Sequence, residues 1–143
     1  MRFSIRTFLI VCPIVAILIA GAISIDRAFR YGIDDAYAEL GASGMVIQCM
    51  EEHDGRWPGN WEDLRQSFDE GGSHINGWSF EEYCQRIHID FDADPKVLRR
   101  LSLTTTSPSF NVIWATQGTG VHFDGGPNKS LYDYFRRDPK VGT

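Results

Sequence analysis

The chain has 143 residues, a formal net charge of −5, 43% hydrophobic residues and 13% aromatic residues. This apolar content is enough for a folded core, which excludes a disordered chain. The length outside one apolar N-terminal segment fits one domain and excludes a second of ordinary size. From Asp26 onward, 19 acidic residues stand against 12 basic residues, and this negative balance opposes general binding to nucleic acid or anionic lipid.

The N-terminal apolar segment runs from Phe8 to Ile25 without a charged residue, and Thr7 can extend it by one position. Its 18 residues lie at the short end of the range of about 17 to 25 that a membrane-spanning helix needs. Arg2 and Arg6 precede it, and basic residues tend to keep the neighbouring end of a span in the cytoplasm. We therefore predict that the segment crosses the bilayer with its N-terminus inside.

Two fates of this segment stay open. As a transmembrane signal-anchor, it divides the chain into a cytoplasmic N-terminus (residues 1–6), a span (residues 7–25) and a single extracytoplasmic domain (residues 26–143). In the alternative, Ala20-Gly21-Ala22 is a signal-peptidase site, and the protein is secreted after cleavage near Ala22. Apolar residues continue past this site through Ile23 and Ile25, which favours the anchor.

The helical period continues beyond the span, because residues 27–52 contain no proline and repeat apolar residues at helical steps. We predict one helix from about Ser4 to Glu52. Gly32, Gly41 and Gly44 each cost about 1 kcal/mol of helix stability relative to alanine, which we interpret as close packing against another element. The predicted buried face consists of Phe29, Ile33, Tyr37, Leu40, Gly44 and Ile47.

Residues 53–59 predict the end of this helix, since Gly55 can adopt the left-handed cap conformation and Pro58 cannot continue a helix. Asn60 is a good N-cap residue, which predicts a short second helix that stops at Gly71-Gly72.

A third short helix is predicted at Phe80–Arg86, because Ser79 and Glu82 have the spacing of a capping box. The large side chains of this region are most simply core residues, and a ligand cage of aromatic rings is the alternative. They are Trp57, Trp61, Leu64, Phe68, Trp78 and Phe80.

The period changes from helical to two after Arg86. Residues 87–93 alternate apolar and polar, which predicts a half-buried strand. Residues 110–116 are apolar on both faces and suit a central strand, with residues 121–123 as the hairpin partner.

Helical signals also occur in this C-terminal part of the chain. Asp94-Pro95 resembles a helix start, although residues 101–105 fit another strand equally well. Leu131, Tyr134 and Phe135 predict a last helical turn, and a basic tail follows it. Together the elements predict an α+β fold class.

Residues 45–64, MVIQCMEEHDGRWPGNWEDL, carry a family resemblance. They resemble the segment in which type IV pilin-like proteins and the major pseudopilins of type II secretion leave their long N-terminal helix. The resemblance implies a long membrane-rooted helix packed on a small antiparallel β-sheet, with short helices between, in a bacterial envelope protein. The family's leader-peptidase motif, of the Gly-Phe-Thr-Leu-x-Glu kind, is absent here, where the chain reads Arg6-Thr7-Phe8-Leu9-Ile10. We therefore carry over the architecture and not fibre assembly.

One group of polar residues has the chemistry of a metal or acid–base site. His88, Asp90 and Asp92 share one face of the predicted strand, and His122 and Asp124 can join them from the hairpin partner. Imidazole and carboxylate groups suit Ca²⁺, Mn²⁺ or Zn²⁺, depending on geometry. The competing interpretation is a solvated sheet face, and it is the one we adopt: no metal site, catalytic residue, cofactor or small-molecule ligand is assigned.

Cys49 and Cys84 are the cysteines outside the apolar segment, in a compartment expected to be oxidising. The sequence leaves open a disulfide between them and a pair of free thiols packed as small hydrophobes.

The sequence favours a non-enzymatic, single-span envelope protein that contacts the bilayer through residues 7–25 and an unknown envelope protein through its domain. The alternative is an anchored or secreted metal-binding domain or metal-dependent hydrolase that uses the His88/Asp90/Asp92 face.

Overall fold

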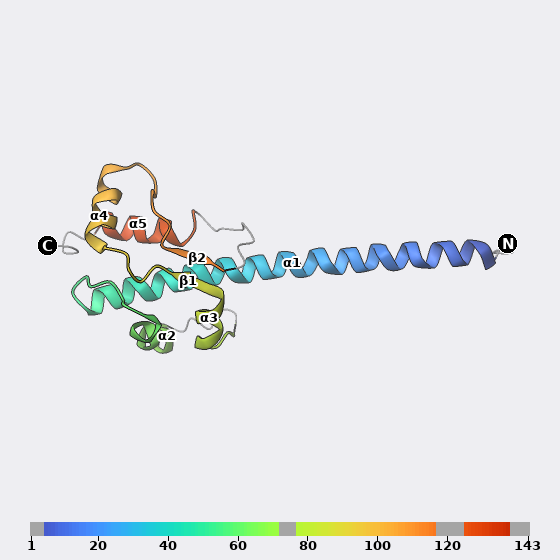
Figure 1. Ribbon diagram of the computed structural model, residues 1–143, viewed down its shortest axis with the longest axis horizontal. Coiled ribbons are helices and arrows are strands. Elements are labelled where there is room, and N and C mark those ends of the chain that lie inside the picture. The colour runs from blue at the N-terminus through green and yellow to red at the C-terminus, as the bar shows by residue number, and fades with distance from the viewer. Residues whose placement is uncertain (1–4, 72–76, 117–124, 138–143) are drawn as a thin grey trace. The chain divides into compact units, whose positions relative to one another are not determined.

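The computed structural model describes residues 5–71, 77–116 and 125–137, with side chains described from residue 12 onward. The fold class is α+β, as predicted: a long N-terminal helix is followed by short helices and a small antiparallel sheet (Figure 1). The chain divides into two compact units, Met1–Tyr31 and Gly32–Thr143. The predicted hairpin partner at residues 121–123 lies outside the described residues, as do His122 and Asp124.

Helix α1 spans Ile5–Glu52 and contains Pro13 in its interior, close to the predicted bounds. Its end is also as predicted: Gly55 has a positive φ of 77° and donates its backbone N–H to the Met50 carbonyl at 2.7 Å. Asp54 shares the left-handed conformation, with φ 52°. By length and composition, Cys12–Glu52 includes an apolar stretch long enough to cross a membrane, a test that a signal sequence also passes.

The buried face of α1 differs from the predicted one. Tyr37 is 40% exposed and Phe29, in the first unit, is 61% exposed, while Ile33, Leu40 and Ile47 are half-buried. The helix instead buries a neighbouring stripe that is rich in small and polar residues. The stripe consists of Asp35, Ala36, Ala38, Glu39, Ala42, Ser43, Met45, Val46, Cys49 and Met50.

The predicted close packing at Gly44 is also wrong. Gly44 is exposed, and a Cβ atom placed there would meet no atom within 4 Å. Of the other two predicted glycines, Gly32 is buried and Gly41 is half-buried. Most small residues of the buried stripe are alanines, which let the helix pack without the conformational cost of glycine.

The segment after α1 folds as predicted. Helix η1 (Trp61–Leu64) and helix α2 (Arg65–Gly71) follow Asn60, whose side chain accepts hydrogen bonds from the backbone N–H groups of Glu62 and Asp63. Helix α3 (Phe80–Arg86) begins with a complete capping box formed by Ser79 and Glu82. These caps satisfy backbone groups that a short helix would otherwise leave without partners.

The described sheet pairs β1 (Ile87–Ile89) with β2 (Ile113–Ala115) in antiparallel register, with His88 opposite Trp114. Both strands are shorter than predicted. Within the described residues β2 has one strand neighbour, so the prediction of a central strand is not met there. Part of its other edge is covered by a side chain: Asn128 accepts hydrogen bonds from the N–H groups of Val112 and Ile113 and donates to the Ile113 carbonyl at 2.9 Å.

Helix α4 (Pro95–Thr104) starts at the predicted Asp94-Pro95 signal, which decides residues 101–104 in favour of helix. Helix α5 (Pro127–Arg137) is longer than the single predicted turn. The two helices pack together, and the Tyr132 hydroxyl donates to the Thr105 carbonyl at 2.7 Å, just after α4 ends.

The core gathers side chains of α1, the short helices and both strands. The aromatic residues predicted to be core are buried or half-buried and meet edge to face, for example Trp61 and Phe80 with ring centroids 6.0 Å apart. Trp57 is 7% exposed, and its indole N–H donates to the Asp90 carbonyl at 2.9 Å. This bond ties the segment after α1 to the end of β1.

Candidate functional site

The predicted polar face at β1 makes structural contacts. The His88 ring stacks against the Trp114 ring of β2, with centroids 4.1 Å apart. One carboxylate oxygen of Asp90 accepts the backbone N–H of Asp92 at 3.1 Å, which stabilises the turn after the strand. Only residues 87–89 form the strand, so Asp90 and Asp92 leave the alternating pattern.

Among the described residues there is no group of three or more His, Cys, Asp and Glu side chains that could hold a metal ion. His122 and Asp124 lie outside the described residues, so the five-residue site remains a hypothesis from the sequence.

Cys49 and Cys84 are free thiols in the structure, Cys49 buried and Cys84 half-buried. Burial raises the pKa of the Cys49 thiol, and the nearby Asp63 carboxylate raises it further. Burial likewise raises the pKa of Cys84, with Glu81 acting in the same direction. Since the thiolate is the reactive form, both groups should react slowly in the folded protein.

Alkylation tests this arrangement. The chain has three cysteines, and we expect all three to be alkylated when the protein is denatured without a reductant. In the folded protein, Cys49 should be modified much more slowly than in the denatured one, because its sulfur is buried and largely protonated. Intact-mass spectrometry gives the count, with a reduced sample as the control. Modification of Cys12 alone in the unreduced sample would demonstrate a disulfide instead.

A pair of buried carboxylates joins α1 to the sheet. Glu39 is 3% exposed, and its carboxylate accepts the backbone N–H of Ala115 in β2 at 2.8 Å. Asp35, one turn earlier and also 3% exposed, accepts a hydrogen bond from the Arg86 guanidinium at 2.8 Å. The same guanidinium lies over the Trp78 ring, 4.0 Å from its centroid. The two carboxylates therefore fix α1 against the C-terminal ends of both α3 and β2.

Burial raises the pKa of the Asp35 carboxyl above its ordinary value of 3.8. The positive charge of Arg86 lowers this pKa in part, and the nearby Glu39 raises it further. Asp35 is a structural group by its contacts, since it meets Arg86 inside the domain. No motif in the sequence marks it. In the sequence, Asp35 and Glu39 are two acidic residues four positions apart within a predicted helix. Such a pair ordinarily indicates an exposed helix face and so does not predict burial.

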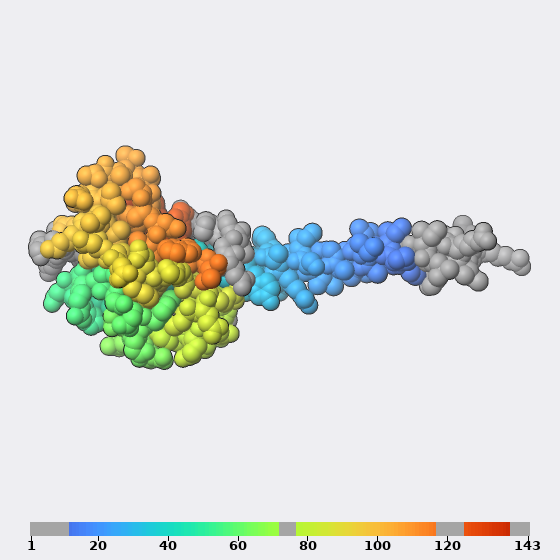
Figure 2. Space-filling model, in the orientation of Figure 1, coloured from blue at the N-terminus to red at the C-terminus, as the bar shows by residue number. Residues whose placement is uncertain are grey.

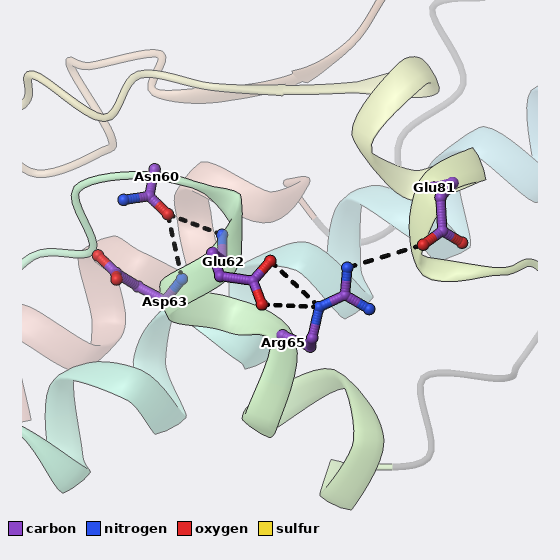
Figure 3. A network of polar contacts seen from close by, with 5 residues as sticks. All are labelled: Asn60, Glu62, Asp63, Arg65 and Glu81. Atoms are coloured by element: carbon purple, nitrogen blue, oxygen red, sulfur yellow. Dashed lines mark hydrogen bonds and ion pairs between the residues drawn. The ribbon is translucent and has the colours of Figure 1, made fainter.

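An acidic surface covers the short helices after α1. It consists of Glu62, Asp63, Asp69, Glu70, Glu81 and Glu82, all exposed. Arg65 lies within it and bridges two of the acids, with N–O distances of 3.0 Å to Glu62 and 3.7 Å to Glu81 (Figure 3). One guanidinium cannot balance six carboxylates, so this surface keeps a negative charge.

A basic groove runs along α4. It has a volume of about 320 Å³ and is lined by Lys96, Arg99, Arg100, Leu103 and Thr104. Lys96 and Arg100 are exposed, and neither forms an ion pair with any residue that the structure describes. Leu103 is 59% exposed beside them. The groove therefore offers positive charge next to an apolar surface.

No protein-family model, curated protein or solved structure matched this chain. The architecture is compatible with the pilin-like layout, since the C-terminal part of a long N-terminal helix packs on a small antiparallel sheet.

Proposed function

We propose that the protein is a single-span membrane protein with a cytoplasmic N-terminus, whose domain outside the cytoplasm acts through contacts with other proteins of a bacterial envelope. One observation carries the membrane part of the proposal. The apolar side chains of residues 12–25 are exposed, among them Ile17 at 70%, Leu18 at 66% and Ile25 at 73%. A continuous exposed apolar helix needs an apolar surrounding, and a bilayer supplies one while the helix satisfies its own backbone.

Two features support a role through protein contacts. The polar residues first considered for chemistry, His88 and Asp90, take part in stacking and turn formation. Two groups of like charges lie instead on the surface of the domain, in the acidic surface and in the basic groove. Separate surfaces of opposite charge steer and orient protein association. The pilin-like resemblance belongs to this proposal as an architecture for presenting such a domain.

A fusion experiment tests the topology. A reporter joined after Thr143 should be active only outside the cytoplasm, and the protein should stay in the membrane after an alkaline wash, because the span is held by its apolar surface. Replacing Ile17 and Leu18 by lysine should abolish this retention, since each charge costs about 3 kcal/mol at the centre of a span. A soluble form beginning near Ile23 would show that the segment is a cleaved signal peptide.

A further inference from the structure

The two charged surfaces lie on opposite sides of the domain. Helix α4, which carries the basic groove, is on one side of the C-terminal part of α1, and α2 and α3 are on the other (Figure 1). The space-filling view places the gold atoms of α4 and the green atoms of the short helices at opposite edges of the same domain (Figure 2). The groove and the acidic surface of one chain therefore cannot pair with each other.

The opposite charges also separate along the sequence. Residues 34–94 contain 15 acidic and three basic residues, whereas residues 95–143 contain three acidic and seven basic residues. A second copy thus presents a surface whose charge is complementary to the groove. Since the two surfaces differ, the contact would be head-to-tail, which leaves one groove and one acidic surface free for further copies.

From this placement we infer that the basic groove of one chain binds the acidic surface of a second copy. This inference rests on the proposed role in protein contacts and names the partner and the surfaces. Lys96 and Arg100 pair with carboxylates of the η1–α2–α3 region, and Leu103 contacts the aliphatic part of the same side chains. The contact lies in the domain and does not depend on the apolar segment.

The groove has the form that such a contact needs. Lys96, Arg100 and Leu103 occur at steps of four and three residues, so they follow one face of α4, while Leu98 and Ser102 on the other face are buried. Its volume of about 320 Å³ is at the small end of binding pockets and is sufficient for a few side chains of an opposing helix. Charged contacts of this kind set the orientation and the rate of association.

Charge exchange between variants tests the inference in the full-length protein in non-ionic detergent. The groove variant carries Lys96→Glu and Arg100→Glu, and the acidic-surface variant carries Glu62→Lys and Glu81→Lys. Each alone should raise the dissociation constant of self-association by about tenfold or more, because each places like charges opposite one another. An equimolar mixture of the two variants should associate as the wild type does, since their surfaces are complementary again.

Sedimentation at about 50 mM and about 500 mM salt measures the effect, and the wild-type association should weaken at the higher salt. The control is Glu51→Lys, which reverses one charge at an exposed position outside the acidic surface, and it should weaken association less than Glu81→Lys alone. Circular dichroism establishes that each variant is folded.

A wild-type chain that stays monomeric would overturn the inference in favour of another acidic protein or an anionic lipid as the occupant. A mixture that fails to associate would also overturn it. Neither outcome bears on the topology measured by the reporter fusion, so failure of this inference and failure of the proposed function remain distinguishable.

Discussion

Replacing Trp57 by alanine should destabilise the domain by about 3 to 5 kcal/mol, because the indole is buried where the chain turns back after α1. A small domain has a total stability of about 5 to 15 kcal/mol, so the variant should be largely misfolded or strongly shifted in its unfolding transition. The loss has two parts, the apolar contacts of the ring and the hydrogen bond from its N–H to the Asp90 carbonyl. Denaturant unfolding followed by circular dichroism measures the total.

A second substitution at Trp57 separates these parts, and a double variant in the neighbouring strand serves for comparison. Trp57→Phe keeps an aromatic ring and removes the donor, so it should lose roughly 1 to 3 kcal/mol for the carbonyl left without this partner, in addition to the smaller volume. The double variant His88→Asn and Asp90→Asn removes the cross-strand ring contact between His88 and Trp114, while asparagine at position 90 keeps an oxygen that can accept the Asp92 N–H. It should therefore lose only about 0.2 to 1 kcal/mol, much less than Trp57→Ala. A stable Trp57→Ala protein would contradict the assignment of this residue to the core.

Arg86→Ala should cost about 3 to 5 kcal/mol, since it removes the partner of a buried carboxylate. Asp35 is 3% exposed and lies near the buried Glu39, so loss of the guanidinium leaves a buried acidic group without its cationic partner. Unfolding of the full chain, compared with an Arg137→Ala control at an exposed position, provides the measurement. The control should change stability by less than about 0.5 kcal/mol.

The double variant Asp35→Leu and Arg86→Met distinguishes a broken ion pair from a general packing defect. Replacing both charges by apolar groups should recover most of the lost stability, because the cost of Arg86→Ala comes mainly from the isolated carboxylate. If the double variant is as unstable as Arg86→Ala, the guanidinium acts mainly through its contact with the Trp78 ring.

The same pair predicts a pH dependence. Because its pKa is raised, the folded state holds the Asp35 proton more tightly than the unfolded chain does. This group therefore favours the folded state below pH 3.8 and loses that contribution as the pH rises through its folded pKa. As the pH rises through this acid range, the free energy of unfolding of Asp35→Asn should fall less, or rise more, than that of the wild type.

Local signals accounted for most helix boundaries. Asn60, the Ser79–Glu82 capping box and Asp94-Pro95 each started a helix in the structure as predicted. Such signals are reliable because a cap satisfies backbone groups within a few residues of itself and needs no distant partner. The apolar segment before Asp26 was also evident from composition, since its length and lack of charge are properties of the chain alone.

The face of α1 that is buried depended on contacts between distant residues. The large apolar residues predicted to face the core lie at its edge or in solvent, while Asp35 and Glu39 are inside. Buried carboxylates are stable there only because Arg86 and the Ala115 N–H, 51 and 76 positions away, supply hydrogen bonds. Helical periodicity identifies apolar stripes, and it carries no information about such partners.

The edges of the sheet illustrate the same limit. Residues 110–116 read as a central strand because both of their faces are apolar, but much of the described second edge of β2 is covered by the side chains of Asn128 and Glu39. These bonds satisfy the strand's N–H groups with acceptors from α5 and α1.

The amino-acid sequence alone therefore established the helix ends, the apolar segment and the fold class, which depend on neighbouring residues. The buried stripe, the sheet edges and the opposite placement of the two charged surfaces were decided by tertiary packing, because each depends on groups that only the folded chain brings together.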